Sequence, residues 1–238
     1  MIRVTVWNEN VHEKEMPEVR KLHPEGLHGT VAAILAKDPE ITVRTATLDD
    51  PECGLTEEVL KETDVLFWLG HAAHQKVPDE VVERVYNHVL CGMGLVVMHS
   101  GHHSKIFRKL CGTPCNLTWH DDARERIFTV NPAHPIAQGI PAHFEIAEEE
   151  CYGEPFSIPE PDELVFLGWF NTGEVFRSGC CFYRGNGRIF YFQPGHETAQ
   201  AYFTPEVHQI WRNAAHWAAP VHRVEKLECP FVPPLEKV

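Results

Sequence analysis

The first half of the chain alternates apolar runs with segments whose apolar residues recur at helical spacing. The apolar runs predict four strands, at 2–7, 41–45, 65–69 and 94–98. The segments between and after them predict helices at 26–37, 56–63, 79–91 and 101–110. This repeated order of strand and helix predicts a doubly wound α/β fold, with a mainly parallel sheet and helices on both faces.

The second half is less regular. The stretch 131–161 is rich in proline, glycine and acidic residues, and the strand-like runs after it are 163–169, 174–183 and 188–193. The sequence Gly185-Asn186-Gly187 predicts a tight turn between the last two strands. A final helix follows Pro205, with a stripe of apolar residues expected in the core. We predict one domain over 1–220 and a Pro-rich arm at 221–238, packed on the surface or on a neighbouring subunit of a homo-oligomer.

The composition excludes several classes of partner. The 238 residues contain 34 Asp plus Glu against 21 Lys plus Arg, a formal charge of −13, and 16 histidines. With roughly a quarter of the histidines protonated at pH 7, the charge is still about −9. A chain this acidic has no general field for binding nucleic acid or an anionic membrane.

The start of the chain predicts its location. It opens directly on a strand pattern, without the layout of a signal peptide, and no apolar run approaches membrane-spanning length. We therefore expect a cytoplasmic protein. Its eight cysteines should accordingly stay reduced, most of them as small buried apolar residues.

Histidines follow three of the expected strands, each close to a glycine: His71, His99 and His196. In an open parallel sheet, ligands bind beyond the carboxyl ends of the strands. Imidazole is the commonest metal ligand in proteins and the usual acid or base at neutral pH. One interpretation is therefore a divalent metal, with zinc favoured, held by these three rings plus a carboxylate or water. His28, at the start of the first long helix, is a fourth candidate ligand.

Other interpretations of the same region stay open. The histidines could act without metal, as acid or base together with Glu150 or Glu197. Either of the adjacent His102 and His103 could replace one of the named ligands. We expect structural roles for six further histidines, His12, His88, His143, His208, His216 and His222.

The turn after the strand at 94–98 contains Ser100. A serine at such a turn could be a hydrolase nucleophile with His196 as its base, but the flanking glycines of that motif are absent. We favour a helix N-cap for Ser100. The acidic run at 148–150 could be a solvated loop, or Glu150 and Tyr152 could reach the cleft as acid/base and hydroxyl group. No phosphate-binding glycine loop is present.

With these residues in view, the chain resembles the ThuA-like (trehalose utilisation) family of the class I glutamine amidotransferase-like superfamily. The resemblance spans about 2–220 and rests on four segments, 94–99, 150–156, 173–179 and 190–197. It implies a flavodoxin-like fold and a role in carbohydrate metabolism, particularly of keto-disaccharides. The amidotransferase relatives carry a nucleophilic cysteine after the central strand and a later histidine with a glutamate. Here His99 stands at the cysteine position, so the resemblance does not extend to glutaminase activity.

These observations lead to three hypotheses. The first is a metal-dependent hydrolase or isomerase of a keto-sugar or disaccharide derivative, with His71, His99, His196 and His28 as ligands. In it Glu150, Tyr152 and Glu197 are the catalytic groups. The second is a non-catalytic sugar-binding or regulatory module, and the third a hydrolase that uses Ser100.

Overall fold

The computed structural model describes residues 1–236, and within them one sheet contains all the strands. The strands are β1 (Ile2–Asn8), β2 (Ile41–Thr47), β3 (Val65–Leu69), β4 (Gly94–Val97), β5 (Thr118–Thr129), β6 (His143–Gly153), β7 (Glu163–Phe170), β8 (Val175–Arg184) and β9 (Gly187–Phe192). The α-helices are α1 (His12–Glu15), α2 (Pro17–Leu22), α3 (Gly26–Leu35), α4 (Glu57–Lys61), α5 (Asp79–Leu90), α6 (Lys105–Cys111) and α7 (Pro205–Ala218). The sheet order is β2-β1-β3-β4-β9-β8-β7-β5-β6.

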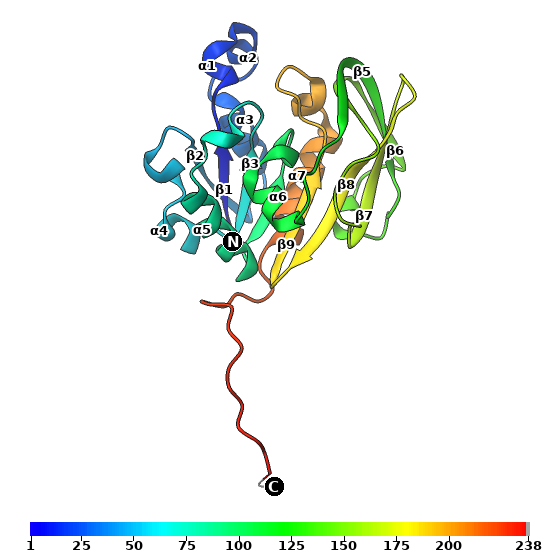
Figure 1. The fold of residues 1–238 in the computed structure, drawn as a ribbon. Coiled ribbons are helices and arrows are strands. Elements are labelled where there is room, and N and C mark those ends of the chain that lie inside the picture. The colour runs from blue at the N-terminus through cyan, green and yellow to red at the C-terminus, as the bar shows by residue number, and fades with distance from the viewer. Residues whose placement is uncertain (237–238) are drawn as a thin grey trace.

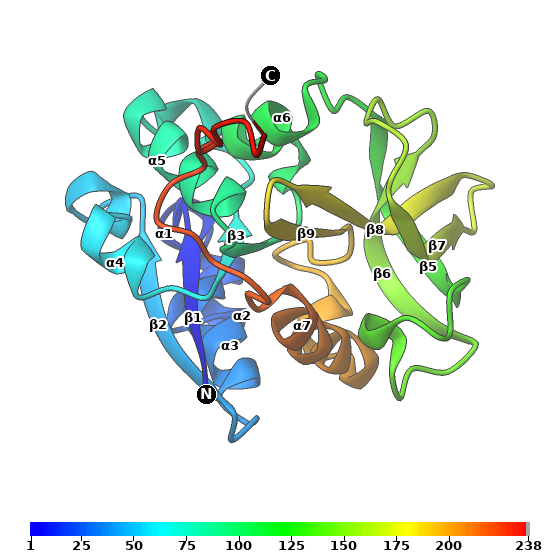
Figure 2. The ribbon, with the colours of Figure 1, turned by 90° about the horizontal axis from the view of Figure 1, so that it is seen from below.

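One end of the sheet is parallel. Strands β2, β1, β3, β4 and β9 are parallel neighbours, in the relative order of a flavodoxin-like sheet. Helices α3 and α7 lie on one side of it and α5 and α6 on the other (Figure 2). The first pair contributes Val31 and Trp211 to one apolar core, and the second contributes Val85 and Phe107 to another. Strands covered on both faces explain the uninterrupted apolar run of β3.

The other end of the sheet is antiparallel, so the prediction of a mainly parallel sheet holds for one end only. Strands β9, β8, β7, β5 and β6 pair with one another in antiparallel fashion. They form a wall beside the parallel part (Figure 1). The three strands expected after residue 162 are present, whereas β5 and β6 were not anticipated. Strand β6 includes the acidic run 148–150, for which a solvated loop was one interpretation. In the folded chain Glu148 is exposed, but Glu149 and Glu150 are buried.

The predicted helix at 101–110 is divided. A 3₁₀ turn at Gly101–His103 precedes α6, and the Ser104 hydroxyl caps α6 by accepting a hydrogen bond from the Phe107 amide at 3.2 Å. Ser100 makes no side-chain capping bond, so the N-cap prediction selected the wrong serine. Before α3, the helices α1 and α2 were also not anticipated.

The Pro-rich arm touches the body near its start. Arg223 donates hydrogen bonds to the carbonyls of Leu60 and Thr63, and the Val224 amide donates one to Cys91. After these contacts the residues up to 236 are exposed, and the chain leads away from the sheet (Figure 1). Within the described part of the chain, no helix is both long enough and apolar enough to cross a membrane.

Candidate functional site

A cleft of about 920 Å³ lies where the parallel and antiparallel parts of the sheet meet. His71 follows β3, Ser100 follows β4 and His196 follows β9, and all of them line this cleft. Glu150 and Tyr152 reach it from β6. The cleft therefore stands beyond the carboxyl ends of the parallel strands, where ligands of open α/β sheets bind.

Three of the four histidines named as candidate ligands lie together. The ring centres of His71 and His99 are 5.4 Å apart, and each lies 5.6 Å from that of His196. The structure does not bring His28 into this group: its Nδ1 is 3.2 Å from the Asn8 amide nitrogen, and among the described residues it belongs to no set of converging ligand atoms. Neither His28 nor Asn8 lines the cleft, so the structure does not support His28 as a ligand.

Glu197 orients two of the histidines. Its Oε2 lies 2.9 Å from His71 Nδ1, and its Oε1 lies 2.5 Å from His12 Nδ1. A carboxylate only accepts hydrogen bonds, so His71 donates from Nδ1 and keeps the lone pair of Nε2. Burial opposes ionisation of Glu197, but the hydrogen bonds from His12 and His71 outweigh it and lower the pKa of the carboxyl group.

His12 is therefore a site residue that sequence reasoning assigned to a structural role. It lies in α1, a few residues after the end of β1, and it lines the cleft beside His71. The hydrogen bond and the charge of Glu197 raise the pKa of His12. One feature of the sequence could have identified His12 as a site residue. It follows a strand of the parallel sheet, as His71, His99 and His196 do.

Glu150 carries a buried oxygen without a hydrogen bond. Its Oε2 lies 2.9 Å from His99 Nε2, yet among the described residues no group donates a hydrogen bond to it. His99 Nδ1 lies 3.0 Å from the Gln193 carbonyl, which only accepts, so the proton of a neutral His99 is on Nδ1. In that neutral form Glu150 Oε2 and His99 Nε2 face each other as two acceptors, whereas a protonated His99 pairs with the carboxylate as a cation. Burial raises the pKa of Glu150 but His99 outweighs it, and the net direction is down.

The arrangement suits a cation. One ligand atom each of His71, Glu150 and His196 lie within 4.8 Å of one another. The Thr198 amide donates a hydrogen bond to His196 Nδ1 at 3.4 Å, so Nδ1 is an acceptor, and His196 Nε2 lies 3.7 Å from Glu197 Oε2. A buried acceptor without a partner calls for an ion, a water molecule or a substrate group. Two imidazoles and a carboxylate can therefore hold a divalent metal at the base of the cleft.

Glu149 connects two of these segments, a role that the sequence analysis did not assign to it. Its buried carboxylate accepts hydrogen bonds from the amides of Glu150, Gly195 and His196, at 3.0, 3.0 and 3.1 Å. The end of β6 is thereby joined to the loop after β9. Burial, and next the Glu125 carboxylate, raise the pKa of Glu149.

The remaining candidates have simpler roles. Tyr152 is buried, with its hydroxyl 3.4 Å from His99 Nε2. Within residues 1–236, no hydrogen bond joins the Ser100 hydroxyl to His196. His102 and His103 line the cleft, but neither belongs to a group of converging ligand atoms.

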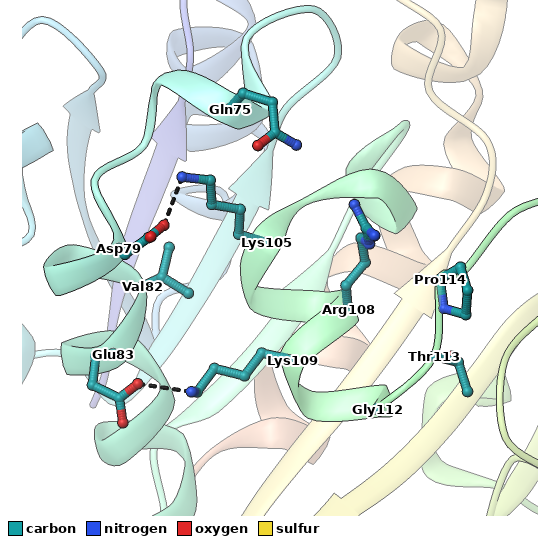
Figure 3. Close-up of a pocket in the computed structure, with 10 residues that line it drawn as sticks. All are labelled: Gln75, Asp79, Val82, Glu83, Lys105, Arg108, Lys109, Gly112, Thr113 and Pro114. Atoms are coloured by element: carbon teal, nitrogen blue, oxygen red, sulfur yellow. Dashed lines mark hydrogen bonds and ion pairs between the residues drawn. The ribbon is translucent and has the colours of Figure 1, made fainter.

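A second cleft, of about 590 Å³, lies between α5 and α6 (Figure 3). Lys105 pairs with Asp79 and Lys109 with Glu83, each at 2.7 Å. No histidine or cysteine is among the residues that line it. It offers neither the ligands nor the nucleophiles of the cleft beside β6.

Comparison with known proteins identifies the family of the chain and agrees with its fold. Residues 3–218 match the sequence profile of the ThuA family, described as trehalose utilisation. A putative ThuA-like protein from Parabacteroides merdae superposes with a TM-score of 0.68 at 17% identity, over 95% of this chain and 92% of that one. A second, from Bacteroides uniformis, superposes with a TM-score of 0.65 at 16% identity, over 91% and 90%.

A cytoplasmic protein from Salmonella typhimurium shares the fold with a TM-score of 0.61 at 13% identity, over 92% of this chain and all of that one (100%). Identities this low show the fold alone. No curated protein sequence matches the chain.

Proposed function

Because the chain belongs to the ThuA family of trehalose utilisation, and hence to carbohydrate metabolism, we propose that it is a metal-dependent enzyme acting on a keto-sugar or disaccharide derivative. The reaction would be a hydrolysis or an isomerisation. One observation carries the metal: the buried Glu150 oxygen that lacks a hydrogen-bond donor and lies with His71 and His196 in the cleft.

The proposed ligands are His71, His196 and Glu150. This set revises the sequence-based proposal, because Glu150 moves from acid/base to ligand and His99 moves to the periphery. Nitrogen and carboxylate ligands with an open position favour zinc, which, when bound, would polarise a carbonyl group or lower the pKa of a water molecule.

The surrounding side chains have assignable tasks. Glu197 holds His71 in the tautomer whose Nε2 faces the cleft. His12, held by the same carboxylate, lines the cleft and can carry a proton to or from a substrate oxygen. The Tyr152 hydroxyl, beside His99, can orient a sugar hydroxyl group. Glu197 thus supports the reaction through its neighbours.

Elemental analysis of the purified protein tests this proposal first. We expect about one transition metal per chain, and turnover of a keto-disaccharide by the loaded protein that stops on chelation. His71→Ala should lose both metal and turnover. The matched control is His143→Ala, which removes an exposed histidine of β6. Metal-free protein with a fully active His71→Ala variant would overturn the mechanism.

A second candidate is a sugar-binding module without catalysis. It is favoured by one observation, that His99 stands after β4 where the amidotransferase relatives carry their nucleophilic cysteine. Sugar binding detected by calorimetry without turnover, over a panel of sugars and keto-sugars, would select it. A hydrolase that uses Ser100 has less support, and covalent labelling of Ser100 by a fluorophosphonate probe would be the evidence for it.

The proposal also covers partners and location. A small sugar is the expected partner, and the formal charge of −13 disfavours nucleic acid and membrane. We propose a cytoplasmic location, supported by the Salmonella relative described as a cytoplasmic protein. A homo-oligomer built with the Pro-rich arm remains a proposal of the same kind.

A further inference from the structure

A second group of candidate metal ligands lies behind the wall of the cleft. His120 of β5 and Cys151 of β6 are paired residues of the antiparallel ladder, and Glu174 lies in the turn between β7 and β8. Successive side chains of a strand point to opposite faces, so Cys151 points away from Glu150 and Tyr152. We call His120, Cys151 and Glu174 the back-face cluster.

The three side chains converge. One ligand atom of each lies within 4.8 Å of the others, and His120 Nε2 is 3.4 Å from Glu174 Oε1. His120 Nδ1 lies 2.9 Å from the carbonyl of Asp121, which only accepts, so Nδ1 donates and Nε2 keeps its lone pair. This is the backbone hydrogen bond that commonly orients a metal-binding histidine.

One further feature indicates a missing ligand at this place. Glu174 Oε2 is buried, and among the described residues it has no hydrogen-bond partner. The buried Cys151 thiol donates a hydrogen bond to the Tyr152 carbonyl at 3.7 Å and accepts one from the Thr172 hydroxyl at 3.9 Å, so its sulfur already faces polar groups. The side chains of His120 and Glu174 are 42% and 34% exposed, so an ion from solution can reach the cluster.

We propose that the back-face cluster binds one thiophilic divalent cation, with zinc the best match. A thiolate, an imidazole and a carboxylate form a zinc donor set, with water in the fourth position. On binding, the metal–sulfur bond forms and the Cys151 proton leaves to solvent. The bound ion would join the β5–β6 pair to the β7–β8 turn, and so stiffen the wall that carries Glu150. This inference does not depend on the chemistry of the cleft.

Cobalt titration of the metal-free full-length protein tests the inference. Co²⁺ bound to a thiolate gives a sulfur-to-metal charge-transfer band, which a site of nitrogen and oxygen ligands alone does not give. We expect a band equivalent to one thiolate per chain. His120→Ala removes a half-exposed side chain and should weaken the affinity seen in this band by at least about tenfold. Cys151→Ser should abolish the band.

Two control variants separate the possible sources of the band. His71→Ala should leave it unchanged, so that failure of the cleft proposal and failure of this one are distinguishable. Cys111→Ser should also leave it unchanged, although Cys111 and Cys115 are neighbouring thiols. The inference is overturned if the wild-type protein shows no band, or if His120→Ala binds cobalt as tightly as wild type. It is likewise overturned if Cys111→Ser removes the band.

Discussion

Replacing Glu125 by glutamine should remove the part of the decline in stability at alkaline pH that ionisation of this buried carboxyl group causes. Glu125 is fully buried on β5, where one oxygen accepts a hydrogen bond from the Ser178 hydroxyl at 2.7 Å. The other oxygen has no partner among the described residues. Burial raises the pKa of this carboxyl group from 4.5 to about 8, so the folded protein holds it neutral at pH 7.

The direction of this pH dependence of stability follows from proton linkage. Between the unfolded and folded pKa values, the folded state binds more protons at Glu125 than the unfolded state does. The stabilisation is therefore complete below about pH 4.5, and it is lost as the pH rises toward 8. The pKa difference of about 3.5 corresponds to about 5 kcal/mol, of which about 4 kcal/mol is lost between pH 5 and pH 9.

Urea unfolding of wild type and Glu125→Gln at pH 5, 7 and 9, with a chelator present, measures this loss. The variant should gain about 4 kcal/mol relative to wild type from the lowest to the highest pH, because an amide cannot ionise. Glu160→Gln, which changes an exposed carboxylate, is the matched control and should follow wild type. Parallel curves for wild type and Glu125→Gln would show that Glu125 is ionised in the folded protein and would refute the reasoning.

Three further outcomes are expected. Glu197→Gln should weaken zinc binding at the cleft by about 10–100-fold, because the amide no longer fixes the His71 tautomer. Calorimetric titration measures this affinity, and an unchanged value would contradict the orienting role of Glu197. Gly195→Ala should cost about 1–3 kcal/mol in urea unfolding, since its φ of +140° is strained for alanine; no loss would mean that the loop adapts freely. Ser104→Ala should cost about 1 kcal/mol by the same assay and Ser100→Ala clearly less, and the reverse order would contradict the capping assignment.

The parallel half of the fold could be predicted because its sequence signals are local. The apolar run of β3 and the stripe of α7 each reflect burial along a single element. The proximity of the histidines after β3, β4 and β9 could be predicted from topology, because the carboxyl ends of parallel strands lie at one edge of the sheet. The family resemblance supported the same arrangement.

Strands β5 and β6 of the antiparallel part, and the supporting residues, could not be predicted, although β7, β8 and β9 could. Glu149 and Glu125 read as surface charges, because their burial depends on strands that pair only in the folded chain. His12 was missed because its partner, Glu197, is far away in sequence. The choice between Glu150 and His99 as ligand depends on hydrogen-bond directions, which a sequence does not contain.

Strand β9 has a consequence for the order in which the molecule can be completed. It lies between β4 and β8 in the sheet, although it is the last strand along the chain. A growing polypeptide that has reached β8 therefore has the parallel and antiparallel parts without the strand that unites them. Domains fold as their residues emerge from the ribosome. Here the two halves of the cleft should come together only after residues 187–192 have been synthesised, late in translation.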